Sequence, residues 1–163
     1  TSPVCTAITI AVPLTAPADA LRGKQNIAVL SHSLPVLNIL SHAKNIQLIS
    51  VSGIYEPRAK GFFGDLALRM LRQFRIDIAF LGVTAVDAED GVMSAVFYEQ
   101  ALKKVLVERA KKKILAIDHT KIGGSSFLKV CDLHEIDGIV TDKFADATFI
   151  TKAKRMGIEV AQV

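Results

Sequence analysis

Hydrophobic and polar positions alternate in two rhythms from residue 26 onward. Short apolar runs rich in Ile, Val and Leu are each followed by a segment whose apolar residues recur with the period of a helix. The runs predict buried strands, and the segments between them predict amphipathic helices. The predicted strands are 26–30, 46–51, 76–83, 113–117, 138–141 and 158–162, and the predicted helices are 34–43, 64–74, 99–112 and 145–156.

This alternation of strand and helix is typical of βαβ units, which build parallel sheets covered by helices. The continuous apolar run from Ile78 to Val83 (IAFLGV) fits a strand that is buried on both faces of such a sheet. We therefore predict an α/β fold with an open, largely parallel sheet and helices on both faces. A length of 163 residues suits a single domain, 1–163.

The first 25 residues follow the pattern least well. Residues 6–12 (TAITIAV) are rich in β-branched side chains and predict a strand from propensity alone. The chain opens on Thr1-Ser2-Pro3 without an initiator Met. This opening suggests a fragment of a longer protein.

Composition narrows the classes of function. Half of the residues are hydrophobic and 22% are charged, which indicates a folded core rather than disorder. No apolar run approaches the roughly 20 residues that a membrane-spanning helix needs. A formal net charge of +4 allows an anionic ligand but is not the concentrated basic stripe of a nucleic-acid-binding domain.

The sequence gives no indication of a disulfide, a metal site or a common catalytic or nucleotide-binding motif. Cys5 and Cys131 form no CxxC pair, and we expect two free thiols in a reducing cytoplasm. The sequence contains no cluster of zinc ligands and no GxSxG, Walker or GxGxxG motif. We therefore predict no metal and no cofactor.

Candidate ligand-binding residues follow the predicted strands, because ligands of open parallel sheets bind outside the carboxyl ends of the strands. Small residues there let a ligand approach the backbone, and free N–H groups with basic side chains suit a phosphate. The residues in these positions are Ser31, His32 and Ser33 after the first strand, Ser52, Gly53 and Arg58 after the second, Gly82 after the third, and Asp118 and Lys121 after the fourth.

Three features allow two interpretations each. Glu99 and Lys103 lie four residues apart on a predicted helix and form either a surface ion pair or part of a pocket rim, where Glu99 binds sugar hydroxyls and Lys103 meets a carbonyl or carboxylate. His32 is either a structural hydrogen-bonding residue or a catalytic one. The run 111–113 (KKK) is either a solvated helix end favoured by the helix dipole or a contact for DNA.

Several motifs then occur in a fixed order between residues 76 and 142. An apolar strand ends in Asp-x-x-Phe-x-Gly, a helix carries Glu-x-x-x-Lys, the next strand ends in Asp-x-Thr-Lys-x-Gly, and Ile-Asp-x-Ile-x-Thr-Asp closes the series. The residues are Asp77, Phe80, Gly82, Gly91, Glu99, Lys103, Asp118, Thr120, Lys121, Gly123, Ile136, Asp137, Ile139, Thr141 and Asp142. Over residues 26–163 this combination resembles the effector-binding domain of the DeoR family of bacterial transcriptional regulators.

The resemblance implies a fold like that of ribose-5-phosphate isomerase and a sensor that binds a phosphorylated sugar. The family's N-terminal winged helix-turn-helix, which binds operator DNA, has no counterpart in this sequence. The resemblance also assigns pocket positions to Ser31-His32-Ser33, Ser52-Gly53 and Arg58, and to Glu99, Asp118 and Lys121, with Lys103 beside them. His32 replaces a family Asn and Ser52 a family Gly, so the identity of the ligand stays open.

The resemblance conflicts with propensity at the N-terminus. It implies that Thr1 and Ser2 are the remnant of a Gly-Thr-Thr loop that grips the phosphate, and that a helix starts at Pro3. Here we follow the resemblance and predict a helix in place of the strand at residues 6–12.

The implied protein is a cytoplasmic regulator, a repressor, without membrane contact. Symmetric operator half-sites would require a homodimer or homotetramer. The alternative is an aldose–ketose sugar-phosphate isomerase of the same fold, in which Glu99, Lys103, Asp118 and Lys121 form a proton-transfer site.

Overall fold

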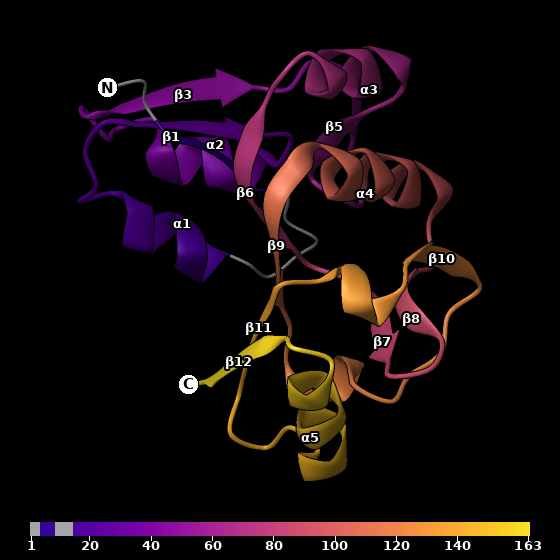
Figure 1. The fold of residues 1–163 in the computed structure, drawn as a ribbon. Coiled ribbons are helices and arrows are strands. Elements are labelled where there is room, and N and C mark those ends of the chain that lie inside the picture. Colours follow the sequence, from indigo (N-terminus) through magenta and orange to yellow (C-terminus); the bar gives the residue numbers. More distant parts are fainter. Residues whose placement is uncertain (1–3, 9–14) are drawn as a thin grey trace.

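A computed structural model of the chain describes residues 4–8 and 15–163 (Figure 1). Strands and helices alternate along most of this length. The helices are α1 Thr15–Leu21, α2 Leu34–Leu40, α3 Asp65–Arg72, α4 Phe97–Arg109 and α5 Ala147–Arg155, with 3-10 turns η1 His119–Lys121 and η2 Leu133–Glu135. The strands are β1 Val4–Ile8, β2 Ile27–Ser31, β3 Ile46–Ser50, β4 Ile54–Glu56, β5 Gly61–Phe63, β6 Ile76–Leu81, β7 Ala85–Asp87, β8 Gly91–Ser94, β9 Ala110–Ala116, β10 Leu128–Cys131, β11 Gly138–Thr141 and β12 Glu159–Gln162.

The main sheet has seven strands in the order β12-β11-β9-β6-β1-β2-β3, and neighbouring strands are parallel. From β1 the chain first builds outward through β2 and β3, then returns to place β6 on the other side of β1. The register pairs Val4 with Ile27 on one side of β1, and Thr6 with Ile78 on the other. The strand order therefore reverses between β1 and β6.

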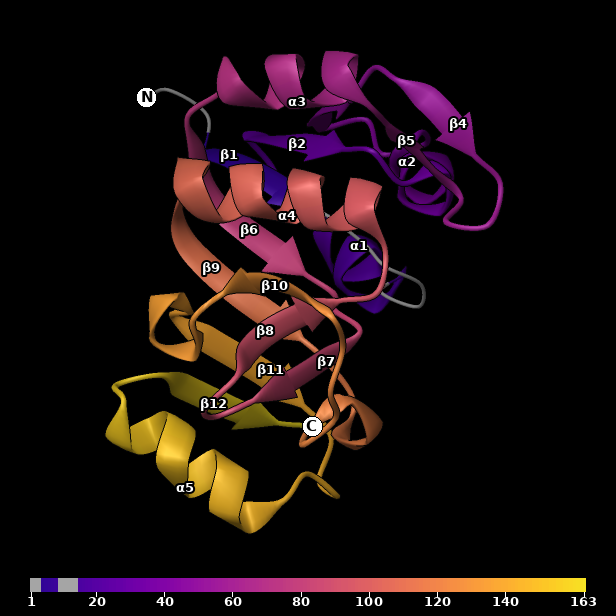
Figure 2. The same ribbon diagram turned by 90° about the vertical axis from the view of Figure 1, so that its right-hand side faces the viewer.

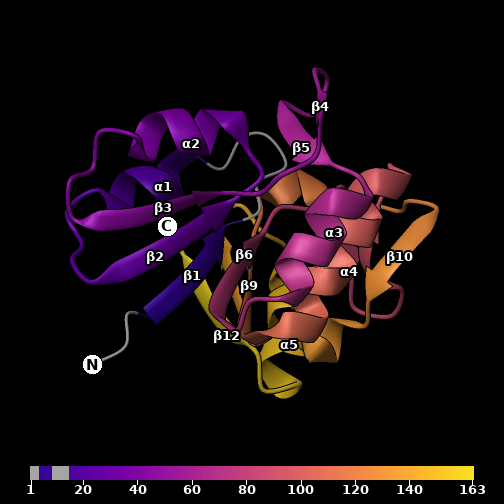
Figure 3. The same ribbon diagram turned by 90° about the horizontal axis from the view of Figure 1, so that it is seen from above.

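Helices cover both faces of this sheet (Figure 3). Helices α1 and α2 pack on one face, where Ala18, Val36 and Leu40 surround Val29 of β2. Helices α3, α4 and α5 lie on the opposite face, over the larger core. Their buried side chains there are Ala67 and Leu71 of α3, Leu102, Val105 and Leu106 of α4, and Phe149, Ile150 and Ala153 of α5. The predicted open parallel sheet with helices on both faces is thus confirmed.

Two small antiparallel units are added to this frame (Figure 2). One is the hairpin β4–β5, which follows β3, and the other is a three-stranded sheet in the order β10-β8-β7 beside α4. Their strands have only three or four residues, too few for the apolar alternation that reveals longer strands. These five short strands are therefore not predictable from the sequence pattern.

The helix predicted from Pro3 onward is wrong. Val4–Ile8 is a strand between β2 and β6, so the propensity of its β-branched residues was the better guide. This strand also removes the basis on which Thr1 and Ser2 were assigned to a phosphate loop, which required a helix after them. Thr1 and Ser2 themselves lie outside the described residues.

The predicted position of the lysine run 111–113 at a helix end is also wrong. Helix α4 ends at Arg109, and Lys111, Lys112 and Lys113 lie on strand β9 instead of a helix end. Each lysine forms an ion pair, with Asp77 at 2.8 Å, Glu159 at 3.2 Å and Asp137 at 3.1 Å respectively. These lysines tie β9 to its neighbours. In the described part of the chain, no helix is long and apolar enough to cross a bilayer.

Candidate functional site

The carboxyl ends of β1 and β6 mark the place where open α/β sheets bind ligands, because the strand order reverses there and leaves a crevice between the diverging connections. Strand β6 ends at Leu81 and is followed by the buried Gly82. The residues directly after β1 lie outside the described ranges. The next strands outward are β2, which ends at Ser31 directly before His32, and β9, which ends at Ala116 two residues before Asp118, so predicted site residues follow the strands on both sides of this point.

On the β2 side the structure brings His32, Glu99 and Lys103 together, and we call these three residues the buried cluster. His32 is 5% exposed and Lys103 is 2% exposed. The Lys103 Nζ donates a hydrogen bond to Glu99 Oε2 over 2.8 Å, in an i,i+4 pair on the first turns of α4. The interpretation of Glu99 and Lys103 as a surface ion pair is therefore wrong, because Lys103 is buried and the side chain of Glu99 is only 16% exposed.

Burial controls the charge states in this cluster. Loss of solvent, with the nearby Lys103 charge as a second cause, lowers the pKa of His32 to about 3, so the imidazole is neutral at pH 7. Burial also lowers the pKa of Lys103, although the Glu99 carboxylate acts in the opposite direction. The cluster thus holds one opposed pair of charges and one neutral ring.

Aromatic side chains position His32. Its ring contacts Phe63 edge-on with centroids 5.0 Å apart, and Phe63 in turn packs on Tyr98 at 4.6 Å. The His32 carbonyl accepts a hydrogen bond from Phe62 N, which ties the end of β2 to the β4–β5 hairpin. A Cβ at Gly61 would lie 3.0 Å from the His32 ring, so only glycine fits beside it without a shift.

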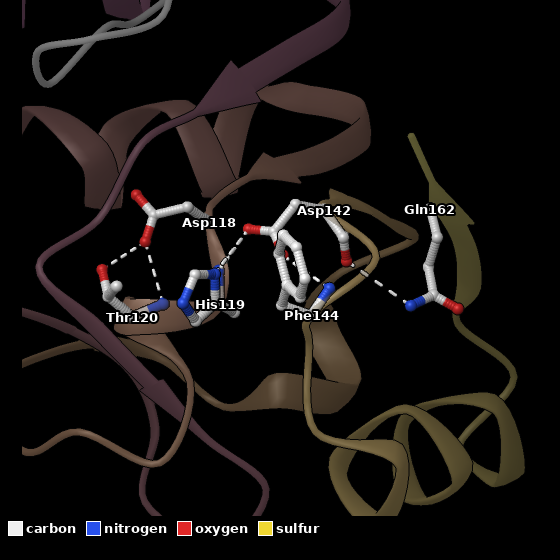
Figure 4. Close-up of polar contacts among 6 residues, drawn as sticks. All are labelled: Asp118, His119, Thr120, Asp142, Phe144 and Gln162. Carbon is white, nitrogen blue, oxygen red and sulfur yellow. Dashed lines mark hydrogen bonds and ion pairs between the residues drawn. The ribbon is translucent and has the colours of Figure 1, made fainter.

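On the β9 side a second group, which we call the exposed cluster, comprises Asp118, His119, Thr120 and Asp142 (Figure 4). Asp118 Oδ1 accepts hydrogen bonds from the Thr120 backbone N at 2.9 Å and from the Thr120 hydroxyl. Asp142 Oδ2 accepts the His119 backbone N–H at 2.8 Å and contacts His119 Nδ1 at 3.0 Å. His119 lies between the two carboxylates in Figure 4.

Hydrogen bonds keep both carboxylates ionised. The Thr120 hydroxyl and backbone N–H, with the charge of Lys121, lower the pKa of Asp118. The His119 backbone N–H lowers the pKa of Asp142. The charge of Lys121 contributes less to this lowered pKa of Asp118 than the Thr120 hydrogen bonds do.

The other predicted residues divide into structural and accessible positions. Ser31 and Ser33 are buried, and the Ser31 hydroxyl accepts the Ser33 backbone N–H at 3.1 Å. Gly53 has a packing role, since a Cβ there would lie 2.4 Å from the Phe63 carbonyl oxygen. Ser52 and Arg58 are exposed, and Arg58 lies in the turn between β4 and β5.

Local sequence patterns did not predict the contact between Phe63 and Tyr98 or the buried Thr141 hydroxyl. Phe63 and Tyr98 meet across elements that are distant in the chain, and no local pattern predicts such a contact. The Thr141 hydroxyl, at the end of β11, is the single fully buried side-chain N or O atom without a hydrogen-bond partner among the described residues. Within those residues, no group of three or more His, Cys, Asp or Glu side chains could hold a metal ion.

Comparison with known proteins identifies the family. The sequence pattern of one family, described as the DeoR C terminal sensor domain, matches residues 12–143. The chain belongs to this family. The resemblance to the DeoR regulators is therefore confirmed, and the membership covers most of the chain, including both clusters.

Curated relatives of this DeoR-type domain are named as regulators. The chain is similar to a putative aga operon transcriptional repressor of Escherichia coli O157:H7, with 30% identity over 146 residues, 90% of this chain and 54% of the relative. It is also similar to the glycerol-3-phosphate regulon repressor of Escherichia coli strain K12, with 26% identity over 77% of this chain and 50% of the relative. The chain thus spans about half the length of these relatives.

Solved structures resemble this DeoR-type domain in fold. The decarboxylase AibA/AibB has a TM-score of 0.54 and 15% identity over 98% of this chain and 82% of its own. A ribose-5-phosphate isomerase bound to phospho-erythronic acid has a TM-score of 0.47 and 17% identity over 74% of this chain and 47% of its own. The likeness to AibA/AibB shows the fold alone, whereas the family match places the chain among DeoR C terminal sensor domains.

Proposed function

We propose that this chain is the effector-sensing domain of a DNA-binding transcriptional repressor, and that a phosphorylated sugar or related metabolite is its effector. The observation that carries the proposal is membership of the DeoR sensor-domain family, whose curated relatives are named repressors. In this proposal residues 1–163 form one domain, and a DNA-binding domain belongs to the rest of the protein.

The effector site in this proposal is the carboxyl edge of the seven-stranded sheet around the β1–β6 reversal. Gly82 allows close approach to the backbone, and the buried and exposed clusters flank the ligand. Lys121 and Arg58 supply positive charge, since neither forms an ion pair among the described residues. A phosphate oxygen is a strong acceptor for such cations.

Regulation follows from unequal affinity of the effector for two arrangements of the protein. A tenfold bias between them requires about 1.4 kcal/mol of differential binding free energy. Symmetric operator half-sites call for a homodimer or homotetramer, and such a regulator works in the cytoplasm. Effector binding would then place the paired DNA-binding domains well or badly for the operator.

The experiment is isothermal titration calorimetry of this chain with a panel of phosphorylated sugars and their unphosphorylated parents. We expect at least one phosphorylated compound to bind at least tenfold more tightly than its parent. Lys121→Met should abolish that preference, whereas Lys154→Met, at an exposed position of α5, should retain it. Equal affinity for phosphorylated and parent sugars throughout the panel would contradict the proposal.

A further inference from the structure

Two exposed phenylalanine rings contact each other at the start of α4. Phe97, the first residue of α4, is 70% exposed, and Phe127, directly before β10, is 73% exposed. Their ring centroids lie 6.2 Å apart in an edge-to-face arrangement. Single exposed apolar side chains are common in soluble proteins, but apolar side chains that adjoin one another on a surface are typical of an interaction site. We call residues 95–97 and 125–128 the aromatic patch.

Ordered elements hold the aromatic patch in place. Helix α4 packs against β10, and β10 is paired with β8 (Figure 2). The Gln100 side-chain amide donates a hydrogen bond to the Lys129 carbonyl oxygen over 2.7 Å, which joins α4 to β10 directly. Because the two rings are already fixed relative to each other, a partner that packs on them has few further groups to order. The patch is therefore suited to direct packing against a second surface.

The charge around the aromatic patch favours a second copy of the chain as the partner. Residues 91–98 and 122–128 contain no Asp, Glu, Lys or Arg, although the whole chain carries a formal net charge of +4. Copies of such a chain repel each other at long range and approach most easily through a region without charge. An uncharged surface also brings no like charges together when it faces its own copy across a two-fold axis.

The size of the aromatic patch matches the centre of a dimer interface. A Phe side chain has roughly 150–250 Å² of surface, so the two rings together expose on the order of 200–350 Å². A standard interface buries about 800 Å² on each partner, with aromatic residues in its centre and polar residues around them. Lys129 and Asp132, an exposed ion pair at 2.5 Å, follow the patch in the chain and supply both signs of charge for such a rim.

We propose that the aromatic patch is the surface through which two copies of this chain form a two-fold symmetric dimer, with the Phe97 and Phe127 rings of the two copies packed together. This inference rests on the proposed function for the expectation that copies associate, and it names the surface that joins them. A homotetramer would contain two such dimers.

The first test is the mass of the chain in solution. Sedimentation velocity of the unaltered chain over a hundredfold range of concentration should give, at the highest concentration, two or four times the 17.6 kDa of one chain. Phe127→Lys places equal charges on both sides of the two-fold axis, so the mass at that concentration should fall by half. We expect the dissociation constant of the dimer to rise at least a hundredfold.

A matched control separates the position of the new charge from the charge itself. Leu66→Lys adds the same charge at a side chain that is 64% exposed on α3, which lies on the other side of α4 from β10 (Figure 2). This variant should keep the mass of the unaltered chain. If Phe127→Lys does not fold, as judged by circular dichroism, Phe97→Ser removes one ring without adding charge and should raise the dissociation constant at least tenfold.

Tryptophan fluorescence tests the surface without disrupting it. The chain contains no Trp, so Phe97→Trp places a single emitting ring in the aromatic patch, and Leu66→Trp places one on α3. At the concentration that gives the oligomer, acrylamide should quench the Phe97→Trp chain at least threefold less than the Leu66→Trp chain. Equal quenching would show that the patch stays in contact with water, which contradicts the proposal.

The outcomes distinguish this inference from the function on which it rests. A chain that is monomeric at every concentration would overturn the proposal and assign the exposed rings to another part of the protein or to a different partner. An oligomer whose mass a folded Phe127→Lys chain retains would also overturn it. Neither result changes the calorimetry with phosphorylated sugars, whereas absence of effector binding by an intact dimer would contradict the proposed function and leave the surface assigned.

Discussion

The buried and exposed clusters flank the same edge of one sheet but are stabilised in different ways. In the buried cluster, Glu99 and Lys103 lie with side chains 16% and 3% exposed, whereas His119 and Asp142 of the exposed cluster are 46% and 28% exposed. The exposed cluster satisfies its carboxylates with backbone N–H groups of its own turns. The buried cluster draws its partners from a strand, a hairpin and a helix.

The difference predicts where substitutions are costly. A buried charge that has lost its hydration is stabilised by its partner, so removal of one member of the pair leaves the other charge buried without compensation. A charge in contact with water recovers hydration when its partner is removed, and its net contribution is small. A pair of opposite charges can thus be essential at one end of the edge and dispensable at the other.

The largest expected effect is that of Glu99→Leu. It leaves the Lys103 ammonium buried without an opposite charge, and we expect a loss of about 3–5 kcal/mol in the free energy of unfolding. Urea denaturation followed by circular dichroism measures this loss. A change below about 1 kcal/mol would show that Lys103 finds another partner or gives up its proton at little cost.

The second effect is a pH dependence caused by His32. The folded pKa of His32 is about 3 and its ordinary value is 6.5, so the unfolded chain binds the proton first as the pH falls. Stability from this residue is complete above pH 6.5 and is lost toward pH 3, at up to about 1.4 kcal/mol per pH unit. Urea denaturation at pH 7, 6 and 5 should show this slope.

His32→Asn provides the control for the pH series, because it removes the titrating ring. The slope between pH 7 and pH 5 should become shallower in this variant, whatever its stability at pH 7. A slope identical to that of the unaltered chain would assign the pH dependence to other groups.

A smaller effect is expected for Asp118→Ala in the exposed cluster. The substitution removes the acceptor for the Thr120 backbone N–H and hydroxyl, and we expect a loss of about 0.5–1.5 kcal/mol in the free energy of unfolding. If Asp118 also contacts the effector, calorimetry should show a loss of affinity at least tenfold. A folded variant with unchanged affinity would restrict Asp118 to a structural role.

The smallest effect is that of Asp142→Asn. The amide oxygen can still accept the His119 backbone N–H, the exposed Phe144 backbone N–H that Asp142 Oδ1 accepts can turn to water instead, and an exposed ion pair contributes only about 0–1 kcal/mol. Urea denaturation should therefore show a change within about 1 kcal/mol. A loss as large as that of Glu99→Leu would remove the distinction between the two clusters.

The sequence predicted the parallel frame well, because strands buried on both faces carry long apolar runs that are unlike helices in period. It predicted the strands of the main sheet and the helices after residue 26, with the boundary between α4 and β9 misplaced, and failed at β1, where a likeness to relatives overrode the β-branched residues of Val4–Ile8. The short strands β4, β5, β7, β8 and β10 escaped prediction because each offers too few positions to show an alternation.

The candidate site was predictable only in part. The strand order indicates which residues lie at the edge of the sheet, but it does not indicate which of their side chains are buried. The rule for strand ends selected His32, Asp118 and Lys121 as candidates from their positions alone. Spacing on a helix could not show that Lys103 is buried, since that burial depends on the packing of α4 against other parts of the chain. A contact between distant segments leaves no mark in local sequence.

The placement of β1 has a consequence for assembly of the domain. Thr6 pairs with Ile78, so the early half of the sheet, β1 to β3, joins the late half, β6 to β12, along a single seam between distant parts of the chain. The pairing of β1 with β6 closes a long loop of chain, and we therefore expect it to form late in folding. If the proposed effector site is correct, a half-assembled chain offers no complete site, and an effector bound there would hold both halves together against unfolding.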